Sequence, residues 1–316
     1  VGYLGPLHAA PVLLNELKCL EYRGYDSAGI ALLSSSGQLN IYKKKGKVIN
    51  LEEVAEGNDI SGTIGIGHTR WATHGEANDT NAHPHFNTNG DLAVIHNGII
   101  ENYYSLKTEL QSRGYVFRSE TDTEVLVHLI EDIQKNAEVK LEEAVRLALN
   151  EVIGAYAIVV LSKNDSNKLI VAKLSSPLVV GIGDDELFVA SDGSPLIEHT
   201  KKVSYLEDGQ MAVLHRDGRL DVNTIKDNKV HVPYIDELQL KLEEIEKGGF
   251  DHFMMKEIHE QPNAIKNSIR GRIDSQQFWV NLGGVREHEA RFRNAHKITI
   301  VACGTSWHSA LIGEYL

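Results

Sequence analysis

The sequence predicts an α+β fold in which two antiparallel sheets pack face to face and helices cover their outer sides. The first two-thirds of the chain alternates short apolar runs with turns, which is typical of strands. Several runs come in pairs around the turn segments SSGQ, NDSN, GDDE and RDGR, and this pairing predicts hairpins. Because so many positions in these runs are apolar, the strands need cover on both faces.

The predicted strands follow one another along the chain, several of them as hairpins. They are VGYLG (1–5), AGIALLSSSGQLNIYKKKG (28–46), GTIGIGHTR (62–70), DLAVIHNG (91–98), GAYAIVVLSKNDSNKLIVAKL (154–174), PLVVGIGDDELFVASDG (177–193) and QMAVLHRDGRLDV (210–222). Amphipathic patterns between them predict helices over 10–20, 103–113, 123–134 and 141–153. Pro11 suits the first turn of the first helix, and Gly114 suits the end of the second.

The character of the sequence changes after about Val232. This part of the sequence is charged, reads as helical and is free of strand signals, which predicts a helical connector over residues 236–295 that follows a first domain of residues 1–235. The segment HKITIVACGTSWHSALIGEYL, residues 296–316, reads as one strand, a turn of small residues and the start of a helix. Since a lone βα unit cannot bury itself, we expect it to begin a doubly wound domain that the sequence does not complete.

Composition and charge narrow the class of protein. Of the 316 residues, 44 are acidic and 32 basic, so the net charge of -12 disfavours binding to nucleic acid or anionic membranes. The longest apolar run, VIGAYAIVVL, is about half the length that a bilayer requires. Two cysteines, Cys19 and Cys303, give no disulfide framework. We therefore expect a cytoplasmic protein whose partners are small molecules or proteins.

The densest polar cluster, GHTRWATHGEANDTNAHPHF (67–86), directly follows an apolar run and contains four histidines. His83 and His85 alternate, with His68 and His74 nearby, so a zinc site is one interpretation, although no carboxylate stands at a familiar spacing. Structural histidines in a rigid loop are the other. Arg70 ends the predicted strand and could hold a small carboxylate through its planar guanidinium, or form a structural ion pair.

Two further motifs each allow a functional and a structural interpretation. Asn97-Gly98 is a strong signal for a hairpin turn, although the chain then runs into a helix and not into a paired strand; the functional interpretation is an oxyanion hole. In SETDTE, Thr121 or Asp122 could cap the helix that follows, with Glu124 in its first turn, or a carboxylate there could bind a substrate ammonium group.

Three smaller features complete the set of candidates. Arg23 lies between a helix and a strand. Cys19 falls on the apolar face of the first predicted helix, so a core thiol is favoured over a nucleophile. Near the end of the chain, Thr305 and Ser306 stand where they could cradle a phosphate at a helix N-terminus or simply cap that helix.

Taken together, these motifs resemble one family. The blocks EYRGYDSAG, HTRWATHG, NAHPH, HNGIIEN, SETDTE and KEIHEQPNAIKN, in this order and followed by ACGTS, closely resemble the glutamine:fructose-6-phosphate amidotransferases, or glucosamine-6-phosphate synthases. The resemblance implies a four-layer αββα sandwich of the N-terminal nucleophile class for the first domain. It also implies a glutaminase half, joined to a sugar isomerase half that begins near His296.

The resemblance also implies roles for individual residues. The residues implied to bind glutamine are Arg70 at its α-carboxylate, Asp122 at its α-ammonium, and Thr73 and His74 in the same pocket. Asn97 and Gly98 would form the oxyanion hole. Arg23 would lie beside the nucleophile, and Trp71 would gate the passage of ammonia. The residues implied to form the fructose 6-phosphate loop are Cys303, Gly304, Thr305 and Ser306.

The implied partners are glutamine and fructose 6-phosphate, together with further copies of the chain through the isomerase domain. No metal or organic cofactor is implied. In this family the nucleophile is a cysteine at the mature N-terminus, in a start like CGIVGYIG, and the match here begins at VGYLG. We therefore expect the nucleophile to be absent from this sequence, with neither Cys19 nor Cys303 in its place. The alternatives are an amidotransferase for another acceptor and an inactive module that binds glutamine or a sugar phosphate.

Overall fold

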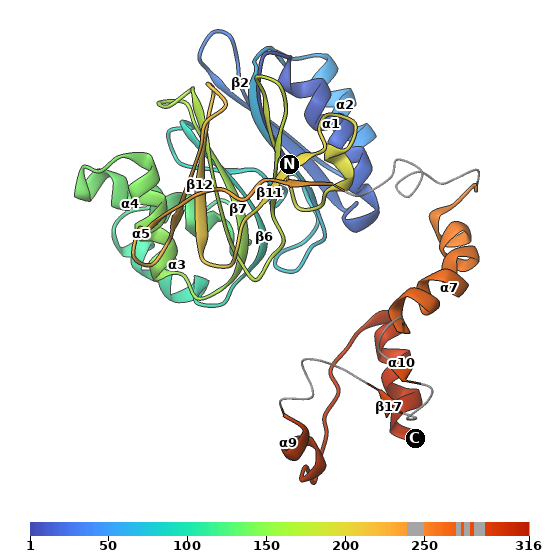
Figure 1. Ribbon diagram of the computed structural model, residues 1–316. Helices are drawn as coiled ribbons and strands as arrows, with labels where there is room; N and C mark the ends of the chain where they lie inside the picture. The colour runs from blue at the N-terminus through green and yellow to red at the C-terminus, as the bar shows by residue number, and fades with distance from the viewer. Residues whose placement is uncertain (239–249, 270–272, 275–278, 281–287, 316) are drawn as a thin grey trace. The chain divides into compact units, whose positions relative to one another are not determined.

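The computed structural model describes residues 1–238, 250–269, 273–274, 279–280 and 288–315 (Figure 1). The chain forms two compact units, one within residues 1–246 and one within 247–316, and each is described by itself. None of the helices in the described ranges is long and apolar enough to cross a membrane.

Two sheets, in which every paired strand is antiparallel to its neighbour, form the centre of the first unit. The order of the first sheet is β15 (Asp236–Glu237), β11 (Lys202–Tyr205), β9 (Val179–Ile182), β10 (Leu187–Ala190), β1 (Gly2–Leu4), β4 (Ile64–Arg70), β2 (Ser27–Leu33) and β3 (Leu39–Lys45). The order of the second sheet is β14 (Val230–His231), β13 (Leu220–Thr224), β12 (Gln210–His215), β8 (Lys168–Leu174), β7 (Gly154–Ser162), β6 (Leu92–Ile100) and β5 (His85–Phe86).

Helices cover the outer face of each sheet, so the first unit is the predicted αββα sandwich (Figure 1). The helices α1 (Ala9–Leu20) and α2 (Val48–Glu56) pack on the first sheet, and α4 (Glu124–Ala137) and α5 (Leu141–Glu151) pack on the second. Next to α4 lies α3 (Tyr103–Ser112). Short 3₁₀ turns, η1 (Glu21–Arg23) and η2 (Ser194–Leu196), follow α1 and β10.

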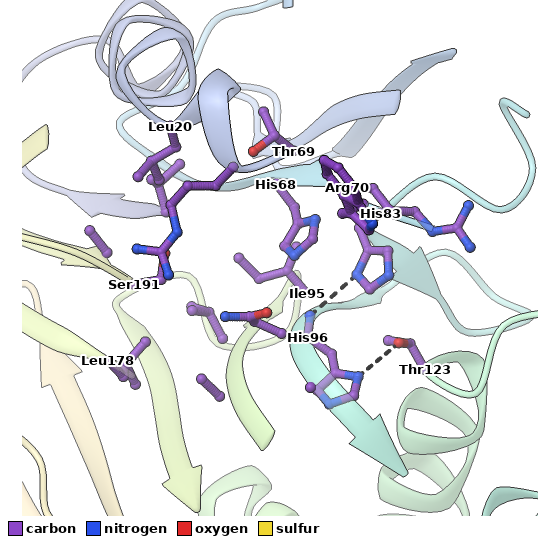
Figure 2. Close-up of a pocket in the computed structure, with 18 of the residues that line it drawn as sticks. Leu20, His68, Thr69, Arg70, His83, Ile95, His96, Thr123, Leu178 and Ser191 are labelled. Atoms are coloured by element: carbon purple, nitrogen blue, oxygen red, sulfur yellow. Dashed lines mark hydrogen bonds between the residues drawn. The ribbon is translucent and has the colours of Figure 1, made fainter. Parts of the chain in front are cut away.

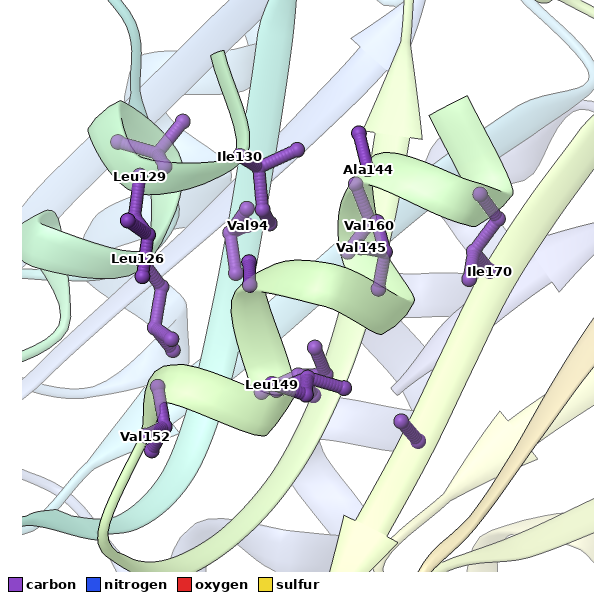
Figure 3. Packing of buried hydrophobic residues seen from close by; sticks show 14 of the residues in the cluster. Val94, Leu126, Leu129, Ile130, Ala144, Val145, Leu149, Val152, Val160 and Ile170 are labelled. Carbon is purple, nitrogen blue, oxygen red and sulfur yellow. The ribbon is translucent and has the colours of Figure 1, made fainter. Parts of the chain in front are cut away.

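Apolar side chains form three layers because residues alternate across each strand. In β6, Val94 faces the layer under α4 and α5, whereas its neighbour Ile95 faces the layer between the two sheets. Figure 3 shows the first of these layers, in which Leu126 and Ile130 of α4 and Leu149 of α5 lie over the strands. These layers orient the strand ends that form the site described below.

The structure confirms the four predicted hairpins and the four predicted helices of the first unit. The hairpins are β2–β3, β7–β8, β9–β10 and β12–β13. The helices begin and end within a few residues of their predicted limits. Helix α2 was not predicted. Its apolar positions Val48, Leu51 and Ala55 are buried, but it is a helix of only nine residues.

The second unit differs in part from the prediction. Helices α7 (Phe253–Ile269), α9 (Glu289–Arg293) and α10 (Gly304–Tyr315) are present, together with a pair of two-residue strands, β16 (Ile273–Asp274) and β17 (Trp279–Val280). Residues 239–249, 270–272, 275–278 and 281–287 of the predicted connector lie outside the described residues.

Two expectations about this region were wrong in detail. The first residues of the predicted connector form β15, because β11 offers it an edge with unpaired backbone groups. The run 297–303, predicted as a strand, is not paired in the structure, although the helix predicted after it is α10. A strand requires a neighbour for its backbone hydrogen bonds, and no strand in the described residues pairs with this run.

A matched pair of isoleucines tests the packing of α4. Ile130→Ala removes a fully buried side chain from the layer under α4, and we expect the free energy of unfolding to fall by about 2 to 5 kcal/mol. Ile49→Ala on α2, where the side chain is 56% exposed, is the control and should change it by less than about 0.5 kcal/mol. Urea denaturation measures both values, and equal losses would contradict the packing described here.

Candidate active site

A cavity of about 260 Å³ opens in the first unit where the ends of strands from both sheets meet (Figure 2). Its walls come from α1, η1, β4, β6, β7, β10 and the segments 71–74 and 121–123. All eight residues predicted for the glutaminase half line it: Arg23, Arg70, Trp71, Thr73, His74, Asn97, Gly98 and Asp122. The cavity therefore brings together side chains that lie up to about a hundred positions apart in the sequence.

Asn97 and Gly98 lie inside strand β6 and not in a turn. They pair with Ala157 and Tyr156 of β7, which excludes the hairpin-turn interpretation of this motif. Gly98 has a φ of +143°, a backbone conformation that favours glycine. A Cβ at this position would come within 2.0 Å of the carbonyl oxygen of Ala155, so a side chain here would displace β7.

Arg70, the last residue of β4, is 4% exposed and is held by backbone groups. Its guanidinium donates to the carbonyl oxygens of Gly75 and Glu76, each at 3.2 Å, and to that of His74. Among the described residues, no carboxylate lies within ion-pair distance of it. Burial lowers the pKa of Arg70, while the charges of Asp26 and Asp122 raise it. The structural ion pair considered above is therefore not formed.

Asp122 does not cap helix α4. The N-cap position is Thr123, and no side chain caps the helix. Instead, the Oδ2 atom of Asp122 accepts a hydrogen bond of 2.7 Å from the backbone N–H of Ile100, at the end of β6. Asp122 is 4% exposed, lines the cavity and contributes a negative charge that acts on Arg70. The cavity thus holds one buried positive and one buried negative side chain that are not paired with each other.

The histidines of the site form hydrogen bonds and ring contacts with one another and with threonines. The rings of His68 and His83 stack with centroids 4.4 Å apart, and His83 accepts a hydrogen bond of 3.3 Å from the backbone N–H of His96. His96 Nδ1 lies 2.9 Å from Thr123 Oγ1, as the dashed lines in Figure 2 show. His85 Nε2 lies 3.0 Å from Thr121 Oγ1.

Burial keeps these imidazoles uncharged. Burial, the largest cause, and the positive groups nearby together lower the pKa of His68 to about 3. Burial also lowers the pKa values of His83, His85 and His96. In the described part of the chain, no three His, Cys, Asp or Glu side chains are placed to hold a metal ion together. The hydrogen bonds and ring contacts of these histidines favour their structural interpretation.

The rim of the cavity is formed by polar and aromatic residues. Arg23, in η1, forms an ion pair of 3.0 Å with Asp192, which lies between β10 and η2. Trp71 is 62% exposed, and its ring meets the ring of Tyr25 edge to face at 5.4 Å. Val1 also lines the cavity, and its nitrogen donates to the carbonyl oxygen of Gly67 at 2.8 Å.

Cys19, the cysteine of the first unit, does not line the cavity. Cys19 is half-buried on α1, and burial raises the pKa of its thiol, which disfavours the thiolate. In the second unit, Cys303 is exposed, and Gly304, Thr305 and Ser306 form the first turn of α10. Gly304 begins that helix with a φ of +60°.

Sequence reasoning missed several residues that position the site. Thr123 and His96 line the cavity and contact each other, but they are 27 positions apart in the sequence. Asp192 was also missed, although it stands at the end of a predicted strand. A polar residue at a strand end is a usable signal for a functional loop.

Comparisons with known proteins agree with the geometry. Residues 54–218 match the family model of a glutamine amidotransferase domain. The chain is 55% identical over 316 residues to a glutamine--fructose-6-phosphate aminotransferase (isomerizing) of Bacteroides thetaiotaomicron, and covers 51% of it. It is 55% identical over 320 residues to the protein of the same name from Chlorobaculum tepidum, and covers 52% of it. All of this chain is matched in both alignments, so it spans about half the length of these curated relatives.

A solved structure is similar as well. The glutamine phosphoribosylpyrophosphate amidotransferase of B. subtilis superimposes with a TM-score of 0.62 at 28% identity, over 72% of this chain and 49% of that one. The αββα arrangement is therefore shared with a known amidotransferase.

Two glycines test the backbone requirement at the cavity. Gly98→Ala forces a side chain into the left-handed region and against Ala155, and we expect a loss of about 1 to 3 kcal/mol in the free energy of unfolding. Gly57→Ala is the control, because Gly57 has a φ of -92° and open space around its Cβ position. Thermal and urea denaturation measure both, and a cost at Gly98 no larger than at Gly57 would refute the constraint.

Proposed function

The chain belongs to the glutamine amidotransferase family, and on this premise we propose that its first unit hydrolyses the side-chain amide of glutamine. We further propose that the complete protein transfers the released nitrogen to fructose 6-phosphate, giving glucosamine 6-phosphate and glutamate. The observation that supports the first proposal best is the cavity, in which Arg70 and Asp122 stand opposite in charge beside the Asn97-Gly98 segment.

Opposite charges suit a substrate that is a zwitterion. We assign the α-carboxylate of glutamine to Arg70, since a planar guanidinium binds a carboxylate through two donors. We assign its α-ammonium group to Asp122, with Thr73 and His74 in the same wall. These assignments give each buried charge of the cavity a partner when the substrate is present, which lowers the cost of burying it.

Asn97 and Gly98 are the proposed oxyanion hole. Attack on the amide carbon places a negative charge on the amide oxygen, and donors fixed in advance stabilise that charge. The Asn97 side-chain amide and the Gly98 backbone N–H are such donors, and the pairing of β6 with β7 fixes their backbone. Strand β6 also contains Ile100, whose backbone N–H donates to Asp122. The proposed oxyanion hole and the position of Asp122 therefore both depend on this strand.

We propose that the nucleophile is a cysteine in a segment ahead of Val1 in the complete protein. Val1 lines the cavity, whereas Cys19, the cysteine of the first unit, does not. Three extended residues span about 10 Å, so a cysteine three positions ahead of Val1 would reach the cavity. Its thiolate would attack the amide carbon, ammonia would leave, and water would then hydrolyse the γ-glutamyl thioester to glutamate. The α-amino group of the cysteine would serve as the base, with Arg23 close by.

The acceptor reaction is proposed from the names of the relatives. Glutamine--fructose-6-phosphate aminotransferases match this chain along its full length. We propose that residues 236–295 connect the glutaminase domain to a sugar isomerase domain that begins within 296–316. Cys303, Gly304, Thr305 and Ser306 would then lie in its phosphate-binding loop, Trp71 would gate the passage of ammonia, and that domain would join copies of the chain into an oligomer.

Adding the nucleophile tests the glutaminase assignment. We expect the chain that starts at Val1 to release no ammonia from glutamine, and the same chain preceded by Cys-Gly-Ile to release it. A chain preceded by Ser-Gly-Ile is the matched control, because an alcohol is a far weaker nucleophile than a thiolate. Ammonia release is measured with glutamate dehydrogenase. Equal rates from all three chains would contradict the assignment.

Asn97→Ala tests the oxyanion hole in the chain that carries the cysteine. Loss of one donor to the developing charge should lower kcat on the order of 10²-fold and leave KM for glutamine nearly unchanged. Asn58→Ala, at an exposed site after α2, is the control. An unchanged kcat in Asn97→Ala would assign Asn97 to the architecture of the strand alone.

A further inference from the structure

The turn at residues 118–124, which carries Asp122 into the cavity, is held by a buried charged cluster on α4 that the mechanism above does not use. We propose that His128 is a positioning residue for the ammonium group of glutamine. Its protonated imidazole bridges Glu124 and Glu131 and so fixes the turn that presents Asp122. This inference rests on the proposed function, because it assumes that Asp122 receives the ammonium group.

Glu124 closes the turn. Its carboxylate accepts hydrogen bonds from the backbone N–H groups of Arg118 and Ser119, at 2.8 and 2.6 Å, and from the Ser119 hydroxyl at 2.6 Å. Asp122 lies between these contacts in the sequence, and its own carboxylate is tied to Ile100. The position of Asp122 therefore depends on Glu124 on one side and on β6 on the other.

Glu124, His128 and Glu131 share one face of α4, because residues four and seven positions apart fall on the same side of a helix. His128 Nε2 lies 3.5 Å from Glu124 Oε1, and His128 Nδ1 lies 3.8 Å from Glu131 Oε2. All three side chains are at least 95% buried. The imidazolium adds a positive charge between the two carboxylates, in addition to Lys135, which pairs with Glu131.

Two aromatic rings pack against His128. The rings of Phe117 and Tyr115 contact the His128 ring, with centroids 4.8 and 5.4 Å away. Burial raises the pKa of Tyr115 to about 12, helped by nearby carboxylates, so its phenol stays neutral.

Few other charges face His128. Lys107 of α3 lies over the Phe117 ring, 4.9 Å from its centroid. On α4, Lys135 pairs with Glu131 Oε1 at 2.6 Å, and Asp132 pairs with Arg113. Within the part of the chain that the structure describes, the carboxylates that directly face the imidazole are those of Glu124 and Glu131.

The protonation states agree with this arrangement. Burial alone lowers the pKa of His128, but contacts with Glu124 and Glu131 outweigh it and raise the pKa above the ordinary value. Burial disfavours the Glu124 carboxylate, yet His128, Ser119 and Arg118 lower its pKa to about 2. Because the folded-state pKa of His128 is raised, its contribution is complete below about pH 6.5, its unfolded value, and is lost as pH rises through the folded-state value.

The experiment compares two ligands that hydrolysis cannot consume, L-glutamate and glutarate, which lacks the α-amino group. Calorimetric titration of this chain gives the ratio of their affinities, which we call the ammonium preference. We expect Asp122→Asn to abolish the preference. His128→Gln should lower it about tenfold at pH 6 while leaving the affinity for glutarate within twofold, because only the ammonium contact depends on the turn. His231→Gln, at an exposed site on β14, is the control.

The pH dependence of the ammonium preference distinguishes a positioning role of His128 from a merely structural one. In the parent chain the ammonium preference should fall as pH rises through the pKa of His128, which NMR of its ring protons reports directly. Glu131→Gln removes one facing carboxylate, so the pKa and the loss of preference should both move to lower pH. Glu131→Gln also serves as the second test if His128→Gln does not fold.

The results distinguish the inference from the function on which it rests. No preference in the parent chain, or a preference unchanged in Asp122→Asn, overturns the assignment of Asp122 and the inference with it. A preference lost in Asp122→Asn but retained in His128→Gln overturns the inference alone. An equal loss of affinity for L-glutamate and glutarate in His128→Gln also overturns the inference. So does a pH midpoint for the loss of the ammonium preference that is the same in Glu131→Gln as in the parent chain.

Discussion

The pairing of β6 with β7 is the interaction on which the cavity depends. It runs without a break from Leu92 to Ile100 and passes through Asn97 and Gly98. Because side chains alternate along the strand, Ile95 faces the layer between the sheets, and His96 reaches back to Thr123. The strand then ends at Ile100, whose N–H holds Asp122. One ladder of backbone hydrogen bonds thus sets the geometry of the proposed oxyanion hole and of the acidic side chain.

The second constraint is electrostatic. Arg70 and Asp122 are both almost fully buried, yet backbone groups hold them and they do not pair with each other. Buried charges without partners are costly, so a fold retains them where something else compensates the cost. A zwitterionic ligand between them is such a compensation, and the neutral histidines around them add no competing charge. The arrangement is better suited to an amino acid than to a substrate with a single charge.

Much of the fold could be predicted, because its signals are local. The turn segments SSGQ, NDSN, GDDE and RDGR each join the two strands of a confirmed hairpin.

The predictions from sequence were incomplete where the structure depends on contacts between residues that are distant in the sequence. The run 297–303 has strand composition but no neighbouring strand in the described residues, and Asn97-Gly98 has a turn sequence but is paired within β6. The contacts of His96 with Thr123 and of Asp122 with Ile100 join separate elements, so spacing could not reveal them. Motifs alone singled out Arg70, Asn97-Gly98 and Asp122, and the resemblance supplied their roles; the structure places the residues of the glutaminase half around one cavity.

We propose that the cavity binds the α-amino acid end of glutamine between Asp122 and Arg70. A crystal structure of this chain with L-glutamate tests it most directly. We expect the α-ammonium nitrogen within hydrogen-bond distance of the Asp122 carboxylate and the α-carboxylate within reach of the Arg70 guanidinium, with the side chain directed toward Asn97. L-glutamate bound outside the cavity, or bound in it with its amino group away from Asp122, would contradict the claim.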